Sequence, residues 1–84
     1  MSDIRATVRE FILTRCLPGE LPENLRDDTP LRTSGILDSL RTLELVSEIE
    51  RAEGFEIEAH EVDEENFRSV DDIVAFVDQR RAAR

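Results

Sequence analysis

The sequence predicts an all-α protein. We expect a small four-helix bundle, made of three main helices and a short third helix, with a long loop between helices one and two. Three segments place apolar residues at helical spacing, which is typical of amphipathic helices. The one alternating stretch, residues 55–58, is too short and isolated to form a sheet. With 84 residues, the chain is expected to form a single domain over residues 1–84.

The first helix is expected over residues 3–16. Its apolar residues recur at helical spacing: Ile4, Val8, Phe11 and Ile12. Ser2 can cap its start, and Asp3 suits the positive end of the helix dipole. The following loop, residues 17–38, exceeds the roughly 12–15 residues beyond which loops are usually functional or disordered. Its spaced aliphatic residues favour an ordered loop packed on the core: Leu21, Leu25, Leu31, Ile36 and Leu37.

The second helix is expected over residues 39–53, with Gly54 as its stop signal. Its inner face gathers five residues: Thr42, Leu45, Val46, Ile49 and Ala52. Leu40 falls almost opposite this face and Leu43 lies at its edge, so both could form an exposed docking patch. The alternative is that these two leucines pack under the long loop.

Two further helices complete the prediction. Residues 62–66 are expected to form the short third helix, with Val62 and Phe67 pointing inward. Ser69 followed three residues later by Asp72 is a capping pattern, and it predicts a final helix over residues 70–81.

The charge and cysteine content restrict the classes of function. The net charge is −9, and residues 39–79 carry thirteen acidic side chains against three arginines. Nucleic acid is therefore disfavoured as a partner, whereas a basic protein surface would be attracted. Cys16 is the only cysteine, so the chain forms no internal disulfide. Since no apolar run is long enough for a membrane span and no signal peptide is evident, we expect a cytoplasmic monomer.

Few residues could carry chemistry. His60 and Cys16 are too few to form a His/Cys metal site, so no metal is expected. No catalytic motif surrounds Ser39, and autonomous catalysis is not expected. Ser39 stands at the start of the second helix, where a serine commonly acts as a capping residue. A phosphate on Ser39 would also be favoured there, because a helix N-terminus attracts anions.

A series of short motifs extends over nearly the whole chain: Asp28-Thr29-Pro30-Leu31, Gly35-Ile36-Leu37, Asp38-Ser39-Leu40, Leu43-Glu44-Leu45-Val46, Ile49-Glu50, Gly54-Phe55-Glu56-Ile57 and Phe67-Arg68-Ser69-Val70. In this order the series resembles the stand-alone acyl or peptidyl carrier proteins, a phosphopantetheine-binding family. The resemblance implies that Ser39 carries a covalent 4′-phosphopantetheine, with Asp38 and Leu40 as its flanking motif.

The same resemblance implies the partners. A separate, magnesium-dependent phosphopantetheinyl transferase would donate the group from coenzyme A. A loading enzyme would then attach an acyl, aminoacyl or polyketide unit to the terminal thiol as a thioester, and downstream synthase or transferase enzymes would use it. The second helix would be the recognition surface for these enzymes, through Leu40, Leu43, Glu44, Ser47 and Glu48.

Some features depart from the family pattern. Arg41 and Arg51 stand where carriers of fatty acid synthesis usually have acids, and residues 57–60 lack the common proline. These differences favour a carrier dedicated to polyketide, nonribosomal peptide or amino-acid loading. A cavity able to hold an acyl chain would be lined by Leu45, Val46, Ile49 and Phe76. The competing class is a non-covalent acidic helical module that binds a basic protein through Leu40 and Leu43.

Overall fold

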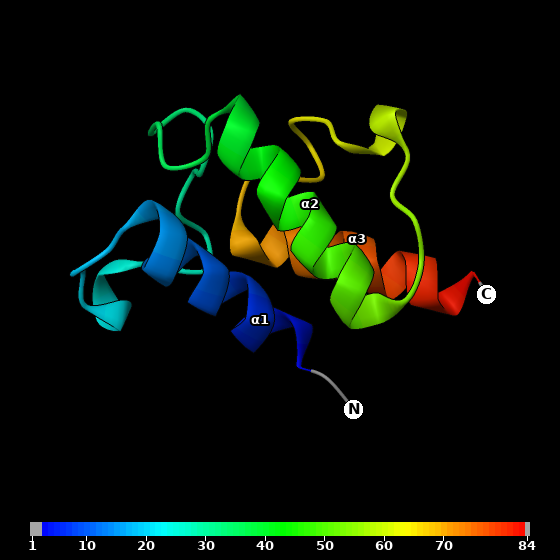
Figure 1. Cartoon of the computed structure of the whole chain (residues 1–84), viewed down its shortest axis with the longest axis horizontal. Coiled ribbons are helices and arrows are strands. Elements are labelled where there is room, and N and C mark those ends of the chain that lie inside the picture. The colour runs from blue at the N-terminus through cyan, green and yellow to red at the C-terminus, as the bar shows by residue number, and fades with distance from the viewer. Residues whose placement is uncertain (1–2, 84) are drawn as a thin grey trace.

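The computed structural model describes residues 3–83, and within them it contains helices and turns but no strand. The three α-helices are α1 (Ile4–Phe11), α2 (Ser39–Glu53) and α3 (Val70–Ala82). Helix α1 packs against both α2 and α3, and in the view of Figure 1 α2 passes in front of α3. The all-α prediction is confirmed.

The first helix starts at Ile4, one residue later than expected. The carboxylate of Asp3 accepts a hydrogen bond from the Ala6 amide at 3.3 Å, so Asp3 is itself the N-cap. Ser2, the cap expected from the sequence, lies outside the described residues. After Phe11 the helix continues as a π-helical turn, η1 (Ile12–Cys16), which ends before Pro18.

The core lies where α1 packs against both α2 and α3. Every helix contributes fully buried side chains to it, among them Val8, Leu45, Ile49, Ile73 and Val77. Phe67, just before α3, packs against Phe76 with the two rings tilted by 48° and their centroids 6.0 Å apart. Ala52, expected on the inner face of α2, is exposed instead because it lies in the last turn of the helix.

The long loop is ordered, as expected, and it adds three leucines to the core. Leu25, Leu31 and Leu37 are buried. An ion-pair network fastens the loop: Asp27 accepts from both Arg5 and Arg9 at 2.8 Å, and Arg5 also reaches Asp71 of α3 at 2.7 Å. The prediction for Leu21 is wrong, since 57% of this residue is exposed; it precedes a short 3-10 turn, η2 (Pro22–Asn24), which has no buried residue.

The short third helix is not found where the sequence placed it. A single 3-10 turn, η3 (Ala59–Glu61), precedes the expected span, and residues 62–69 form turns and bends. Glu58 and Glu61 cap η3 reciprocally, which places the helical turn before residue 62. The Asp63 carboxylate then accepts from the Asn66 amide at 2.8 Å, which closes a tight turn. Over the described residues, the bundle therefore consists of three α-helices with short helical turns.

Candidate functional site

The start of α2 is presented by a rigid end of the long loop. Leu31 donates its amide to the Arg68 carbonyl, and Leu37 donates to the Leu31 carbonyl, both at 2.8 Å. Between them, Gly35 donates to the Arg32 carbonyl at 3.1 Å and has a φ of 83°, a left-handed conformation that favours glycine. These bonds fix the direction in which the chain enters the helix.

Asp38 is the N-cap of α2. Its carboxylate accepts from the Arg41 amide at 2.8 Å, and its carbonyl accepts from the Thr42 amide at 2.9 Å. The Thr42 hydroxyl donates to the same carbonyl at 2.7 Å. The interpretation of Ser39 as a capping residue is therefore wrong, because Asp38 already fills that position.

Ser39 is the first residue of α2, and it is exposed. Within residues 3–83 its hydroxyl has no hydrogen-bond partner. It opens onto a shallow hollow of about 220 Å³, lined by Arg32, Ser39, Thr42, Leu43 and Val62. The accessible oxygen, the open space beside it and an arginine in the lining suit a covalently attached phosphodiester and its arm.

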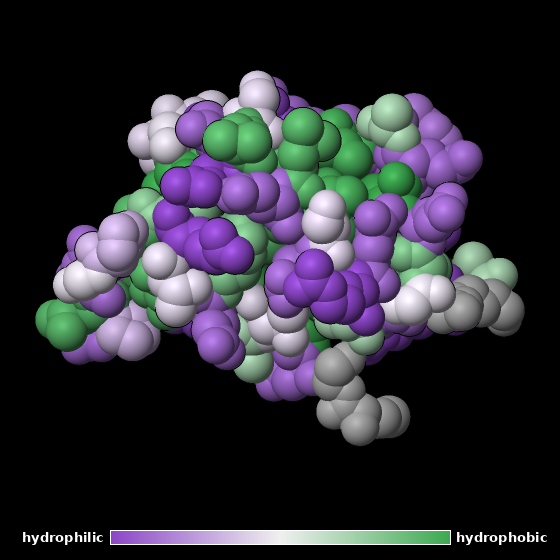
Figure 2. Space-filling model, in the orientation of Figure 1, coloured by the Kyte–Doolittle hydropathy of each residue, from purple (hydrophilic) through white to green (hydrophobic). Residues whose placement is uncertain are grey.

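The outer side of α2 carries an apolar patch near Ser39. Leu40 and Leu43 are each 62% exposed, so the alternative that they pack under the loop is wrong. Figure 2 shows apolar surface gathered around the N-terminal end of α2 and extending towards the segment before η3. Ser47, one turn after Leu43, is exposed on the same side of the helix.

The acids of this surface are paired with its arginines. Glu44 accepts from Arg41 at 2.7 Å, and Glu48 accepts from Arg51 at 3.2 Å. The hydrogen bond that Arg41 donates to Glu44 raises the pKa of the Arg41 guanidinium above its usual value. Glu48 also lines an open groove between α1 and α2, together with Phe11 and Thr14. The patch around Leu40 is consequently apolar and locally close to neutral, although the chain as a whole is acidic.

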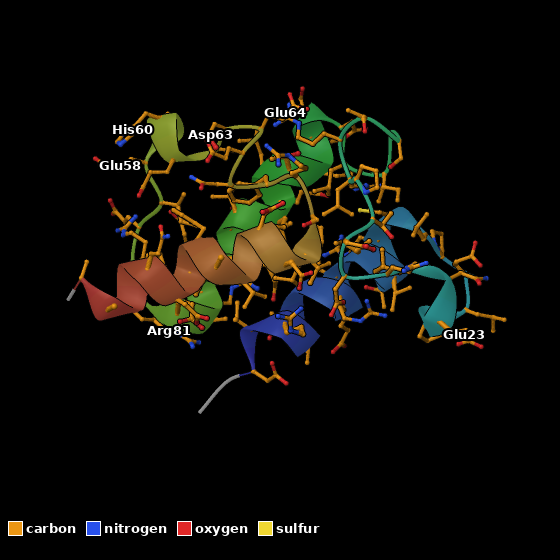
Figure 3. The ribbon with its side chains drawn as sticks, turned by 180° about the vertical axis from the view of Figure 1, so that it is seen from behind. Glu23, Glu58, His60, Asp63, Glu64 and Arg81 are labelled. Atoms are coloured by element: carbon orange, nitrogen blue, oxygen red, sulfur yellow. The ribbon has the colours of Figure 1, made fainter. Side chains whose placement is uncertain are left out.

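Other reactive side chains lie outside this arrangement. His60 is exposed on η3, at the edge of the molecule next to Glu58 (Figure 3). Cys16 is partly buried against the core, and burial raises the pKa of its thiol. Among the described residues, no group of three or more potential ligands could hold a metal ion. None of the described helices is long and apolar enough to cross a membrane.

Two residues of the hollow, Arg32 and Val62, were not singled out as site residues from the sequence. Arg32 lies seven positions before Ser39, and Val62 lies in a distant turn, so only folding brings them together. The four residues expected to line an acyl cavity are all buried in the core: Leu45, Val46, Ile49 and Phe76.

Comparison with known proteins assigns the class that this geometry indicates. The family model for the phosphopantetheine attachment site matches residues 12–77, a span that begins at η1, directly after α1, and includes all of α2 and most of α3. The chain belongs to this family of carrier domains, and its prosthetic group is 4′-phosphopantetheine. The resemblance seen in the sequence is confirmed.

One solved structure provides a close comparison. A chain in a structure described as "Crystal structure of FAD-dependent dehydrogenase" is 36% identical to this chain, with a TM-score of 0.75. The match covers 83% of this chain and 97% of that chain, so the two are similar in length. No curated protein matches the sequence.

Proposed function

We propose that this protein tethers acyl, aminoacyl or polyketide intermediates as thioesters on a 4′-phosphopantetheine arm attached to Ser39. The observation that carries the proposal is the free hydroxyl of Ser39. Because Asp38 caps α2, the Ser39 oxygen is exposed at the start of the helix and has no hydrogen-bond partner among residues 3–83. It also lies inside the segment that matches the attachment-site family.

Attachment of phosphopantetheine requires little chemistry from the chain itself. The Ser39 oxygen forms a bond to the pantetheine-side phosphorus of coenzyme A, adenosine 3′,5′-bisphosphate leaves, and the hydroxyl proton passes to the transferase. The arm supplies the terminal thiol that holds the cargo. Asp38 holds the helix start in place, and the exposed backbone around Ser39 admits the transferase. The protein then acts as a carrier without catalysis of its own.

The patch formed by Leu40 and Leu43 supports a role in docking partner enzymes. Two exposed leucines beside the attachment point can be desolvated on contact, while Glu44, Ser47 and Glu48 supply polar contacts around them. Because Arg41 and Arg51 already neutralise two of the acids, partners should rely less on basic surfaces than an acidic helix would suggest. A Leu40→Ser variant should be loaded more slowly by its cognate enzyme without losing stability.

The pathway belongs to the proposal as well. The arginines on α2 favour a specialised cytoplasmic pathway, with polyketide, aminoacyl or peptidyl cargo. Besides the transferase and a loading enzyme, the partners would be downstream synthases or transferases.

Intact-mass measurement tests the attachment. The purified protein is incubated with coenzyme A, Mg²⁺ and a broad-specificity phosphopantetheinyl transferase. The wild type should gain the mass of one phosphopantetheine, and Ser39→Ala should gain nothing. Ser34→Ala is the matched control, since Ser34 is an exposed serine of the preceding loop and its variant should be modified normally. An unmodified wild type would instead support a non-covalent acidic module that binds a basic protein.

A further inference from the structure

Arg32 differs from most other arginines of the chain. Its side chain is partly buried and lines the hollow beside Ser39. Within residues 3–83 its guanidinium forms no hydrogen bond or ion pair, although the protein has a net charge of −9. Arg5, Arg9, Arg41 and Arg80, in contrast, all pair with carboxylates. A half-buried, unpaired cation in an acidic protein indicates a position suited to an anion that arrives later.

The backbone of Arg32 is fixed in advance. The carbonyl of Arg32 accepts from Gly35, and the neighbouring Leu31 is anchored through its amide to Arg68 and through its carbonyl to Leu37. Leu31 is also fully buried. The guanidinium therefore projects from a rigid turn, and less conformational entropy is lost when it binds an anion.

The remaining lining of the hollow is mainly apolar. Leu43 comes from the first turns of α2, and Val62 comes from the segment that follows η3. Thr42 is buried and its hydroxyl is already bonded to Asp38, so it offers no free donor to a ligand. Arg41, the other cation near the start of α2, is occupied by Glu44. Among the described residues, Arg32 is thus the one cation lining the hollow.

We propose that Arg32 is a positioning residue that pairs with the phosphodiester on Ser39 and holds the first part of the arm across the hollow, where Leu43 and Val62 contact its gem-dimethyl group. This inference rests on the proposed attachment at Ser39. The ligand chemistry fits the lining, because the pantoyl unit places a negative phosphate and two methyl groups within a few bonds of each other. A guanidinium can bind two phosphate oxygens at once, which fixes orientation as well as position.

The test uses fully modified protein, so that attachment is established by mass before positioning is measured. Apo and holo forms of the wild type, Arg32→Gln, Arg32→Lys and Arg26→Gln are compared by NMR. Arg26→Gln is the matched control, because it removes the same charge from an exposed position in the same loop. The readouts are the Arg32 Nε–H signal, the ³¹P signal, and NOEs between the arm's methyl groups and those of Leu43 and Val62.

In the wild type, the Arg32 Nε–H signal should shift between the apo and holo forms, and the methyl NOEs should be present. Arg32→Gln should lose the NOEs and move the ³¹P signal, while Arg26→Gln should leave both unchanged. Arg32→Lys, which keeps the charge without the fork of donors, should retain part of the NOE intensity.

Two results would overturn the inference. One is an Arg32 signal that is the same in the apo and holo forms, or NOEs that survive in Arg32→Gln. The other is an Arg32 signal that shifts only when the thiol is loaded with a carboxylate-bearing acyl group, because the anion would then be the cargo. A wild type that gains no mass contradicts the attachment at Ser39 itself, which distinguishes that failure from a failure of Arg32.

Discussion

Asp38→Ala should destabilise the protein, whereas Ser39→Ala should not. The Asp38 carboxylate satisfies the Arg41 amide at 2.8 Å in the first turn of α2. Replacing an N-cap aspartate by alanine typically costs about 1 kcal/mol, within a range of roughly 0.5–2 kcal/mol. For a domain of this size, each kcal/mol lowers the melting temperature by about 4–8 °C.

Ser39 occupies the first helical position and makes no hydrogen bond through its side chain to any described residue. Alanine has a higher helix propensity than serine, by up to roughly 0.5 kcal/mol. We therefore expect the free energy of unfolding of Ser39→Ala to equal or slightly exceed that of the wild type. Ser69→Ala is a second control, because Ser69 caps α3 by accepting from the Asp72 amide. This variant should lose about as much free energy of unfolding as Asp38→Ala.

Urea unfolding followed by far-UV circular dichroism measures all three variants on the apo protein. Asp38→Ala and Ser69→Ala should both lose stability, and Ser39→Ala should show no such loss. If Ser39→Ala lost as much stability as Asp38→Ala, the serine would be acting as the cap, and its free hydroxyl could no longer support the proposed attachment.

Three further predictions concern other parts of the fold. Because burial raises the pKa of the Cys16 thiol, iodoacetamide should alkylate Cys16 in the native holo protein at least about tenfold more slowly than the arm thiol; equal rates, measured by mass spectrometry, would contradict this burial. The Glu58 amide and Arg80 lower the pKa of Glu61 below its usual 4.5. Its carboxylate therefore stabilises the fold above about pH 4.5 and ceases to do so as the pH falls through the lowered value. The stability difference between the wild type and Glu61→Gln should accordingly shrink in acid, and a constant difference would count against the prediction. Arg80 pairs with Glu61, donates to the Glu56 carbonyl and lies 4.6 Å from the Phe55 ring centroid. Arg80→Met should therefore cost about 2 kcal/mol in urea unfolding, whereas a loss no larger than that of Arg26→Gln would show that these contacts contribute little.

Local signals in the sequence predicted much of the fold. The bounds of α2 follow from its starting residue and from Gly54, which adopts the left-handed conformation that ends the helix. The Ser69 cap predicted the start of α3 in the same way. These signals depend on residues within one or two turns, and such information is present in the sequence itself.

The predictions that failed depend on long-range contacts or on local contacts that compete with each other. The short helix expected over residues 62–66 does not form, because the reciprocal capping of Glu58 and Glu61 places the helical turn earlier. The hollow could not be foreseen, because Val62 reaches Ser39 only after the segment between α2 and α3 has folded back. Likewise, nothing in the spacing of the sequence showed that Arg32 would be left without a partner.

Tandem mass spectrometry of the modified peptide tests the central claim most directly. Trypsin cleaves after Arg32 and Arg41 and releases residues 33–41, which contain three hydroxyl groups, those of Thr33, Ser34 and Ser39. We expect phosphopantetheine on this peptide, with fragment ions that place it on Ser39 alone. Fragment ions that place it on Thr33 or Ser34, or a peptide without the group in protein treated with coenzyme A and transferase, would contradict the account.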